Sequence, residues 1–309
     1  MSLSRRILLK ASKSVWLRER APQYRFVQRT ARRFLPGQTP EQALEAARML
    51  AEDGVGAILT HLGENINHRE EAEAVAQHYA GVLRRILASG PRVEVSVKLT
   101  QLGLDIDEEY CFENVMRLIE ESGADKTVWI DMEQSAYTDA ALRIYRRAIA
   151  MGVKAGVCVQ AYLYRTEQDV GSLVALGGAV RLVKGAYNEP SEIAFPRKRD
   201  VDENFFRIAQ ALLGPDAQRS KLRAAIGTHD RILIARIIEW AAKQGVAKER
   251  LEFQMLYGIQ RAEQLRLARE GYRSGVLINY GSSWYPWFMR RMAERPANVM
   301  FLARNLFSG

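Results

Sequence analysis

Short apolar runs alternate with amphipathic stretches along the whole chain. Eight of these runs have the length and the β-branched content of strands: residues 54–62, 93–100, 127–131, 155–161, 179–184, 224–227, 251–255 and 275–279. Most are apolar at successive positions, which is typical of parallel strands covered by helices on both faces. The pattern therefore predicts an α/β protein.

Helical periodicity fills the gaps between these runs, at about 70–88, 112–122, 138–151, 167–176, 202–213, 230–244, 259–270 and 284–306. Thr166 is placed to cap one helix, and Gly152, Gly245 and Gly271 are placed to end others. Eight strands, each followed by a helix, predict a (β/α)8 barrel. The alternative is a doubly wound sheet, which would normally have a glycine-rich phosphate turn after its first strand. Residues 62–65 do not form one.

The net charge of the 309-residue chain is concentrated at its N-terminus. Residues 1–33 contain ten Lys and Arg residues and one Glu, which accounts for the whole net charge of +9. We expect residues 1–50 to be a basic arm of two or three helices and residues 51–309 to be the barrel. Because the body is neutral, a uniformly basic domain that wraps nucleic acid is disfavoured. An amphipathic basic arm suits anionic headgroups at the inner face of a cell membrane, and an arm that only caps the barrel remains the alternative.

The content of cysteine, histidine and long apolar runs limits which classes of protein remain possible. Cys111 and Cys158 cannot make a disulfide framework or a cysteine-rich metal site, which favours a reducing compartment. The four histidines show no zinc spacing, so we expect no metal. No apolar run approaches the roughly 20 residues of a membrane-spanning helix. We therefore expect a cytoplasmic protein.

Polar residues close nearly every apolar run at its C-terminal end, where (β/α)8 barrels carry their chemistry. They are Lys98, Asp131, Glu133, Gln160, Lys184, Thr228, His229, Asp230, Gln254, Tyr257 and Tyr280, and the apolar Met132 stands between Asp131 and Glu133. Arg181 lies inside an apolar run and must find buried partners. Lys98 and Asp131 follow adjacent strands and could equally form a structural ion pair. Arg290 and Arg291 lie among aromatic residues, where they could form helix salt bridges or bind a carboxylate or phosphate.

Seven motifs occur in an order that resembles the monofunctional bacterial proline dehydrogenases, over about residues 40–307. They are VKL (97–99), DME (131–133), VQAY (159–162), RLVKGAY (181–187), GTHD (227–230), FQMLYG (253–258) and RRMAERP (290–296). The resemblance implies a distorted (β/α)8 barrel that binds FAD at the strand ends. It implies oxidation of L-proline to Δ1-pyrroline-5-carboxylate by hydride transfer from C5 to flavin N5. Electrons would then pass to a membrane quinone.

The resemblance also implies roles for individual residues. The catalytic pair would be Asp131, paired near Lys98, and Arg181, which would contact the flavin near N5. The FAD would be lined by Met132, Gln160, Arg181, Lys184, Gly185, Ala186, Thr228 and His229. The proline carboxylate would be bound by Lys98, Arg290 and Arg291, while Tyr187 and Leu256 would flank the ring.

Two positions depart from the family pattern near the substrate ring. Leu277 and Trp287 stand where the family commonly has tyrosine, so the preference between proline and its hydroxylated form is open. Two other functions remain as alternatives. One is a Schiff-base lyase that uses Lys98 or Lys184. The other is a binding protein whose basic arm holds nucleic acid.

Overall fold

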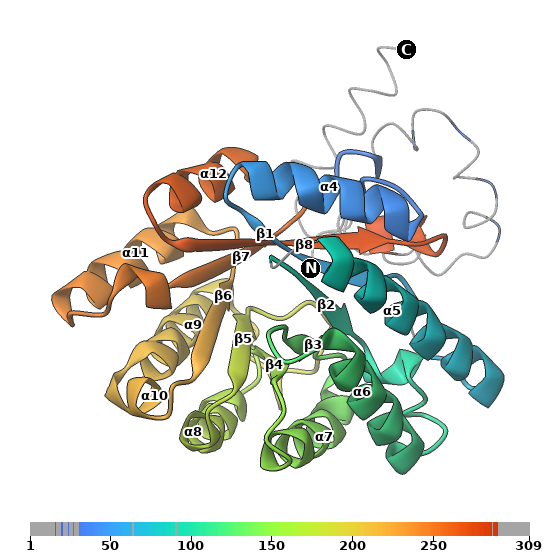
Figure 1. The fold of residues 1–309 in the computed structure, drawn as a ribbon. Helices are drawn as coiled ribbons and strands as arrows, with labels where there is room; N and C mark the ends of the chain where they lie inside the picture. The colour runs from blue at the N-terminus through green and yellow to red at the C-terminus, as the bar shows by residue number, and fades with distance from the viewer. Residues whose placement is uncertain are drawn as a thin grey trace.

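The computed structural model describes residues 31–63, 65–89, 92–285 and 287–289, together with Trp16, Arg20, Tyr24 and Val27. Eight parallel strands pair in chain order and close into a barrel (Figure 1). They are β1 (Gly56–His61), β2 (Val93–Val97), β3 (Val128–Ile130), β4 (Ala155–Gln160), β5 (Ala179–Val183), β6 (Arg223–Gly227), β7 (Glu252–Leu256) and β8 (Arg273–Tyr280). Each coincides with a predicted strand, and the predicted (β/α)8 barrel is confirmed.

Helices surround the barrel, as Figure 1 shows. They are α4 (Pro40–Glu52), α5 (Arg69–Ser89), α6 (Glu108–Ser122), α7 (Thr138–Ala150), α8 (Thr166–Leu176), α9 (Lys198–Leu213), α10 (Pro215–Arg219), α11 (Arg231–Lys243) and α12 (Arg261–Arg269). Helix α4 precedes β1 and packs outside β1 and β8. Its start is fixed by a capping box between Thr39 and Gln42.

Three helices differ from the expectation, and one of them, α9, begins at Lys198, four residues earlier than predicted. Helix α6 begins four residues earlier than predicted, because the Asp107 side chain accepts a hydrogen bond from the backbone N of Tyr110 at 2.7 Å. Helix α10 was not expected, and Pro215 supplies its first turn. The predicted helix over 284–306 lies mostly outside the described residues.

The barrel interior is identified by side chains from distant strands that share one cluster. Ile58, Trp129, Ala179, Ala225 and Leu277 come from five different strands and pack together. Only the inside of a closed barrel can bring these five strands into contact. Since side chains alternate along a strand, this cluster identifies which residues point inward.

The N-terminal stretch packs against the segment that follows β8. An apolar cluster joins Val27, Ala31, Phe34, Leu35, Leu62, Trp284, Tyr285, Trp287 and Phe288. Most of the basic arm, and the further helices predicted there, lie outside the described residues. Within the described part of the chain, no helix is long and apolar enough to cross a membrane.

Candidate active site

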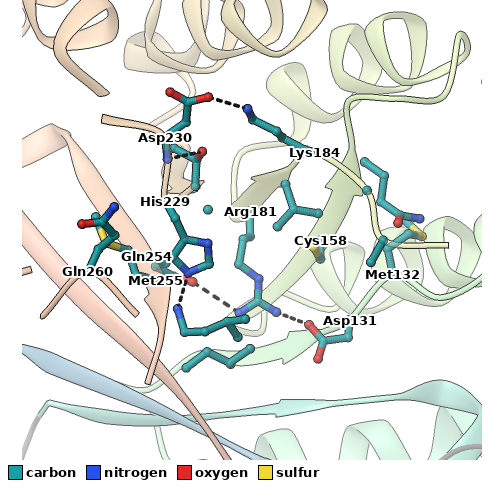
Figure 2. Close-up of a pocket in the computed structure, with 18 of the residues that line it drawn as sticks. Asp131, Met132, Cys158, Arg181, Lys184, His229, Asp230, Gln254, Met255 and Gln260 are labelled. Atoms are coloured by element: carbon teal, nitrogen blue, oxygen red, sulfur yellow. Dashed lines mark hydrogen bonds and ion pairs between the residues drawn. The ribbon is translucent and has the colours of Figure 1, made fainter. Parts of the chain in front are cut away.

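A cavity of about 720 Å³ opens at the C-terminal ends of the strands (Figure 2). Its size is in the usual range for small-molecule sites, roughly 300–1,000 Å³. The lining includes most of the side chains predicted for the site: Asp131, Met132, Gln160, Arg181, Lys184, Gly185, Ala186, Tyr187, Thr228, His229 and Leu256. The structure therefore brings these residues into one place, while their individual roles remain predictions.

Arg181 lies at the floor of this cavity, inside the barrel. Its Nη2 donates to Ser96 Oγ at 2.7 Å and to the Asp131 carboxylate, and its Nη1 donates to Gln254 Oε1 at 3.3 Å. Burial alone would lower the pKa of Arg181, but the charge of Asp131 and smaller contributions from neighbouring groups together outweigh burial and raise that pKa. The cavity floor therefore holds a permanent cation in a fixed orientation.

The partner of Asp131 differs from the sequence expectation. Asp131 forms its ion pair with Arg181 rather than with Lys98. Lys98 is not among the residues that line the cavity, and its Nζ donates to the carbonyl oxygen of Gly63 at 3.2 Å. The reason is geometric, because Arg181 reaches across the barrel interior to residues of β2, β7 and the end of β3.

A second group of charges surrounds the mouth of the cavity. Lys184 Nζ lies 2.5 Å from Asp202 Oδ1 and 2.8 Å from Asp230 Oδ2. Lys198, at the start of α9, pairs with the same two carboxylates. Burial alone would raise the pKa of Asp230, but the hydrogen bond and charge of Lys184 outweigh it and lower that pKa to about 2.

Gly185 makes the turn that carries the chain from β5 along the cavity. Its φ of +117° is a conformation that residues with side chains rarely adopt. A Cβ at this position would also lie 2.2 Å from a ring carbon of Tyr162. Both facts require glycine at position 185. The glycine of the KGA motif is therefore explained by backbone geometry, whether or not it also contacts a ligand.

His229 and Gln160 are held by backbone groups. The backbone N of Leu256 donates to His229 Nε2 at 2.9 Å. Gln160 is buried, and its Nε2 donates to the carbonyl oxygen of Glu133 at 2.9 Å. These contacts fix both side chains against the cavity wall.

The structure describes two of the four remaining positions near the predicted substrate site. Leu277 lines the cavity, whereas Trp287 packs in the apolar cluster with Phe34. Arg290 and Arg291 lie outside the described residues, so their predicted contact with the proline carboxylate stays a prediction.

Several lining residues were not predicted, among them Cys158, Lys198, Arg231, Ile232, Met255 and Gln260. Cys158 precedes Gln160 by two positions on β4, so strand alternation could have identified it. Burial raises the pKa of its thiol, which therefore stays protonated. Gln260 adopts a left-handed conformation just before α12, and no sequence signal marks it.

The lining combines positive charge with apolar surface. Four cationic side chains and two carboxylates give it an excess of positive charge, which suits an anionic diphosphate: Arg181, Lys184, Lys198 and Arg231 against Asp131 and Asp230. Met132, Val183, Met255 and Leu256 add apolar surface for a ring system. Among the described residues, no group of three or more His, Cys, Asp or Glu side chains is arranged to hold a metal ion.

Comparisons with known proteins agree with this geometry. Residues 43–304 match the sequence profile of the proline dehydrogenase family. Proline dehydrogenase 1 of Bacillus subtilis is 37% identical over 277 residues, which cover 89% of this chain and 90% of that one. Proline dehydrogenase of Deinococcus radiodurans is 35% identical, with 90% of each chain covered.

Among solved structures, proline utilization A from Bdellovibrio bacteriovorus, inactivated by N-propargylglycine, has a similar fold. Its TM-score is 0.78 at 26% sequence identity. The match covers 87% of this chain but only 33% of that longer protein. The family match and the curated relatives together show that the chain belongs to the proline dehydrogenase family.

Proposed function

We propose that this protein oxidises L-proline to Δ1-pyrroline-5-carboxylate, with FAD bound in the cavity as the hydride acceptor. Membership of the proline dehydrogenase family makes it an oxidoreductase that acts on proline in proline catabolism. The flavin, the hydride step and the acceptor are our own proposal. The single observation that carries it is a buried, ion-paired arginine at the floor of a cavity whose lining is positively charged overall.

Residues at the C-terminal ends of β3 to β6, together with the start of α9, are the ones that would hold the FAD. Lys184 and Lys198 offer charge to the diphosphate, while Gly185 and Ala186 let the backbone approach it closely. Met132, Gln160, Thr228 and His229 complete the wall. When bound, the flavin would accept the hydride from proline C5 at its N5.

Arg181 is the residue we assign to stabilising the transition state. Its guanidinium is already oriented by Asp131, Ser96 and Gln254, so no reorganisation is needed when negative charge develops beside it. The Asp131 carboxylate orients this cation, and it prevents an unpaired buried charge.

The substrate would be held between Tyr187 and Leu256, with Leu277 as a further apolar wall. Lys98, Arg290 and Arg291 are proposed to bind its carboxylate. The two guanidinium groups can each make two parallel hydrogen bonds to a carboxylate, and the Lys98 ammonium would add a positive charge. Fixing one end of so small a substrate would place its C5 for reaction. Lys184 is already bonded to two carboxylates, which argues against a free nucleophilic amine and thus against a Schiff-base lyase.

We also propose a membrane quinone as the electron acceptor, with the basic arm as a peripheral contact to anionic lipid. The positive charge of residues 1–33 supports this contact. Co-sedimentation with vesicles of anionic lipid should retain the full chain better than a chain that lacks residues 1–33. Equal retention of both would rule out the role of the arm.

The proposed reaction is tested by an anaerobic titration. The protein, purified or reconstituted with FAD, should show an oxidised-flavin absorption band, and L-proline should bleach it. A parallel titration with trans-4-hydroxy-L-proline resolves the preference left open by Leu277 and Trp287. A colourless protein that cannot be reconstituted with FAD would contradict the proposal.

A further inference from the structure

A partly buried group of charges lies in the barrel interior on the opposite side of Arg181 from the cavity. Arg223 begins β6, Glu252 begins β7 and Glu94 is the second residue of β2. Arg223 binds the Glu94 carboxylate at 2.6 and 3.0 Å and the Glu252 carboxylate at 2.8 and 2.9 Å. Because β2 lies across the barrel from β6 and β7, this double bidentate grip spans the interior.

Trp129 connects this group to the cavity floor. Its Nε1 donates to Glu94 Oε2 at 2.8 Å, and its indole is fully buried. The guanidinium of Arg223 lies 5.1 Å from the ring centroid, and the guanidinium of Arg181 lies 5.1 Å from the same centroid. Both distances are within the range of cation–π attraction. Gly156 makes room for the indole, because a Cβ there would lie 2.4 Å from the ring.

Gln254 makes a second connection between the same two groups. Its Oε1 accepts from Arg181 Nη1 at 3.3 Å, while its Nε2 donates to Glu252 Oε1 at 2.7 Å. The contacts therefore form a closed circuit of six residues: Arg181, Gln254, Glu252, Arg223, Glu94 and Trp129. Within this circuit, Gln254 and Trp129 contact the Arg181 guanidinium directly. Apart from Arg181 itself, Gln254 is the one member of the circuit that lines the cavity.

We propose that Arg223, Glu94, Glu252 and Trp129 are positioning residues, which fix the orientation of the Arg181 guanidinium and so set the reduction potential of the bound flavin. The inference rests on the proposed function, since it concerns a flavin held above Arg181. A buried cation acts strongly on nearby charge only if its orientation is maintained, because little solvent screens it. Loosening the circuit should therefore destabilise the reduced flavin.

Arg223→Lys is the first test, because it keeps the positive charge but loses the fork that grips two carboxylates. The flavin reduction potential is measured on the holoenzyme by equilibration with a reference dye. We expect the equilibrium to shift at least tenfold toward oxidised flavin, which is about 30 mV for a two-electron couple. We also expect kcat for proline to fall by a larger factor than KM changes.

Arg236→Lys is the matched control. Arg236 also lies over an aromatic ring, 3.9 Å from the Phe206 centroid, and binds a carboxylate of Glu203 at 2.7 and 2.8 Å. It does so on the outer surface, between α9 and α11. The same exchange there should leave the flavin potential at the wild-type value.

Trp129→Phe provides a second, milder variant if Arg223→Lys does not fold. It keeps an aromatic ring but removes the Nε1–H that binds Glu94, and its potential should shift in the same direction. Folded variants that hold flavin at the wild-type potential would overturn the inference alone. A wild-type protein that binds no flavin would overturn the proposed function and this inference with it.

Discussion

The floor and the mouth of the cavity hold similar ion pairs in different surroundings. At the floor, the Arg181 side chain is 4% exposed and pairs with Asp131 inside the barrel. At the mouth, the Lys184 side chain is 25% exposed and shares two carboxylates with Lys198, which is 74% exposed. Arg181 lies in β5 and Lys184 directly follows this strand, so these two cations are only three residues apart.

This difference in burial separates two tasks. Charges at the floor are poorly screened and have a fixed set of partners, so they can act on the reacting atoms. Charges at the mouth are screened by water and can exchange one anionic partner for another. We therefore expect the floor to govern the rate of proline oxidation and the mouth to govern the affinity for flavin.

The largest effect is expected at the floor, from Asp131→Asn. This change leaves the buried Arg181 cation without its counter-charge, which typically costs about 3–5 kcal/mol of stability. Misorienting a preorganised group also slows chemistry by roughly a hundredfold or more. Urea unfolding and stopped-flow flavin reduction measure the two effects. The mouth variant Asp202→Asn should be much less affected, and equal effects in both would remove the distinction.

A partly buried base, His61, extends the comparison to the end of β1. Burial, with smaller contributions from His78 and Lys98, lowers the pKa of His61 from 6.5 to about 4. Between these values the unfolded chain binds the proton and the folded protein does not, so stability falls as the pH drops from 6.5 to 4. After discounting for partial exposure, the loss should be about 2 kcal/mol.

The His61 contribution is measured as the slope of unfolding free energy against pH. Because His61→Gln removes the titrating group, this variant should show a smaller slope than the wild type over the same window. Identical slopes in the two proteins would show that His61 does not titrate in this way.

At the mouth, Lys184→Met should weaken flavin binding by about tenfold, the value of one charge-assisted hydrogen bond. It should also reduce the dependence of the flavin dissociation constant on salt, since one cation is lost. Quenching of flavin fluorescence by the apoprotein measures both. Lys243→Met, which removes a surface partner of Glu239 on α11, is the control and should bind flavin normally. An unchanged salt dependence in Lys184→Met would contradict the role of the mouth.

The smallest effect is expected from an ion pair on the outer surface. Arg236→Ala removes the partner of Glu203, whose side chain is largely exposed. Such pairs contribute at most about 1 kcal/mol, so thermal unfolding should shift by a few degrees or less. A loss as large as that of Asp131→Asn would mean that burial does not decide the strength of these pairs.

The sequence was sufficient for the barrel and for much of the cavity lining. Apolar runs identified all eight strands, because parallel strands covered by helices must be apolar on both faces. The residues that end these runs were then placed together by the topology alone. Arg181 was marked by its position inside an apolar run, where a cation must have partners.

Contacts across the barrel could not be predicted in the same way. Adjacent strands suggested Lys98 as the partner of Asp131, whereas the partner is Arg181, two strands away. The link from Glu94 to Arg223 joins opposite walls of the barrel and has no local sequence signal. Asp202 lies on a helix, and its approach to Lys184 depends on how α9 packs.

The most direct test of this account is the rate at which L-proline reduces the flavin in a single anaerobic turnover. Wild-type protein should bleach, while Arg181→Lys should retain flavin and bleach at least a hundredfold more slowly. Equal rates in the two proteins, or a wild-type flavin that L-proline does not reduce, would contradict the central role given to the cavity floor.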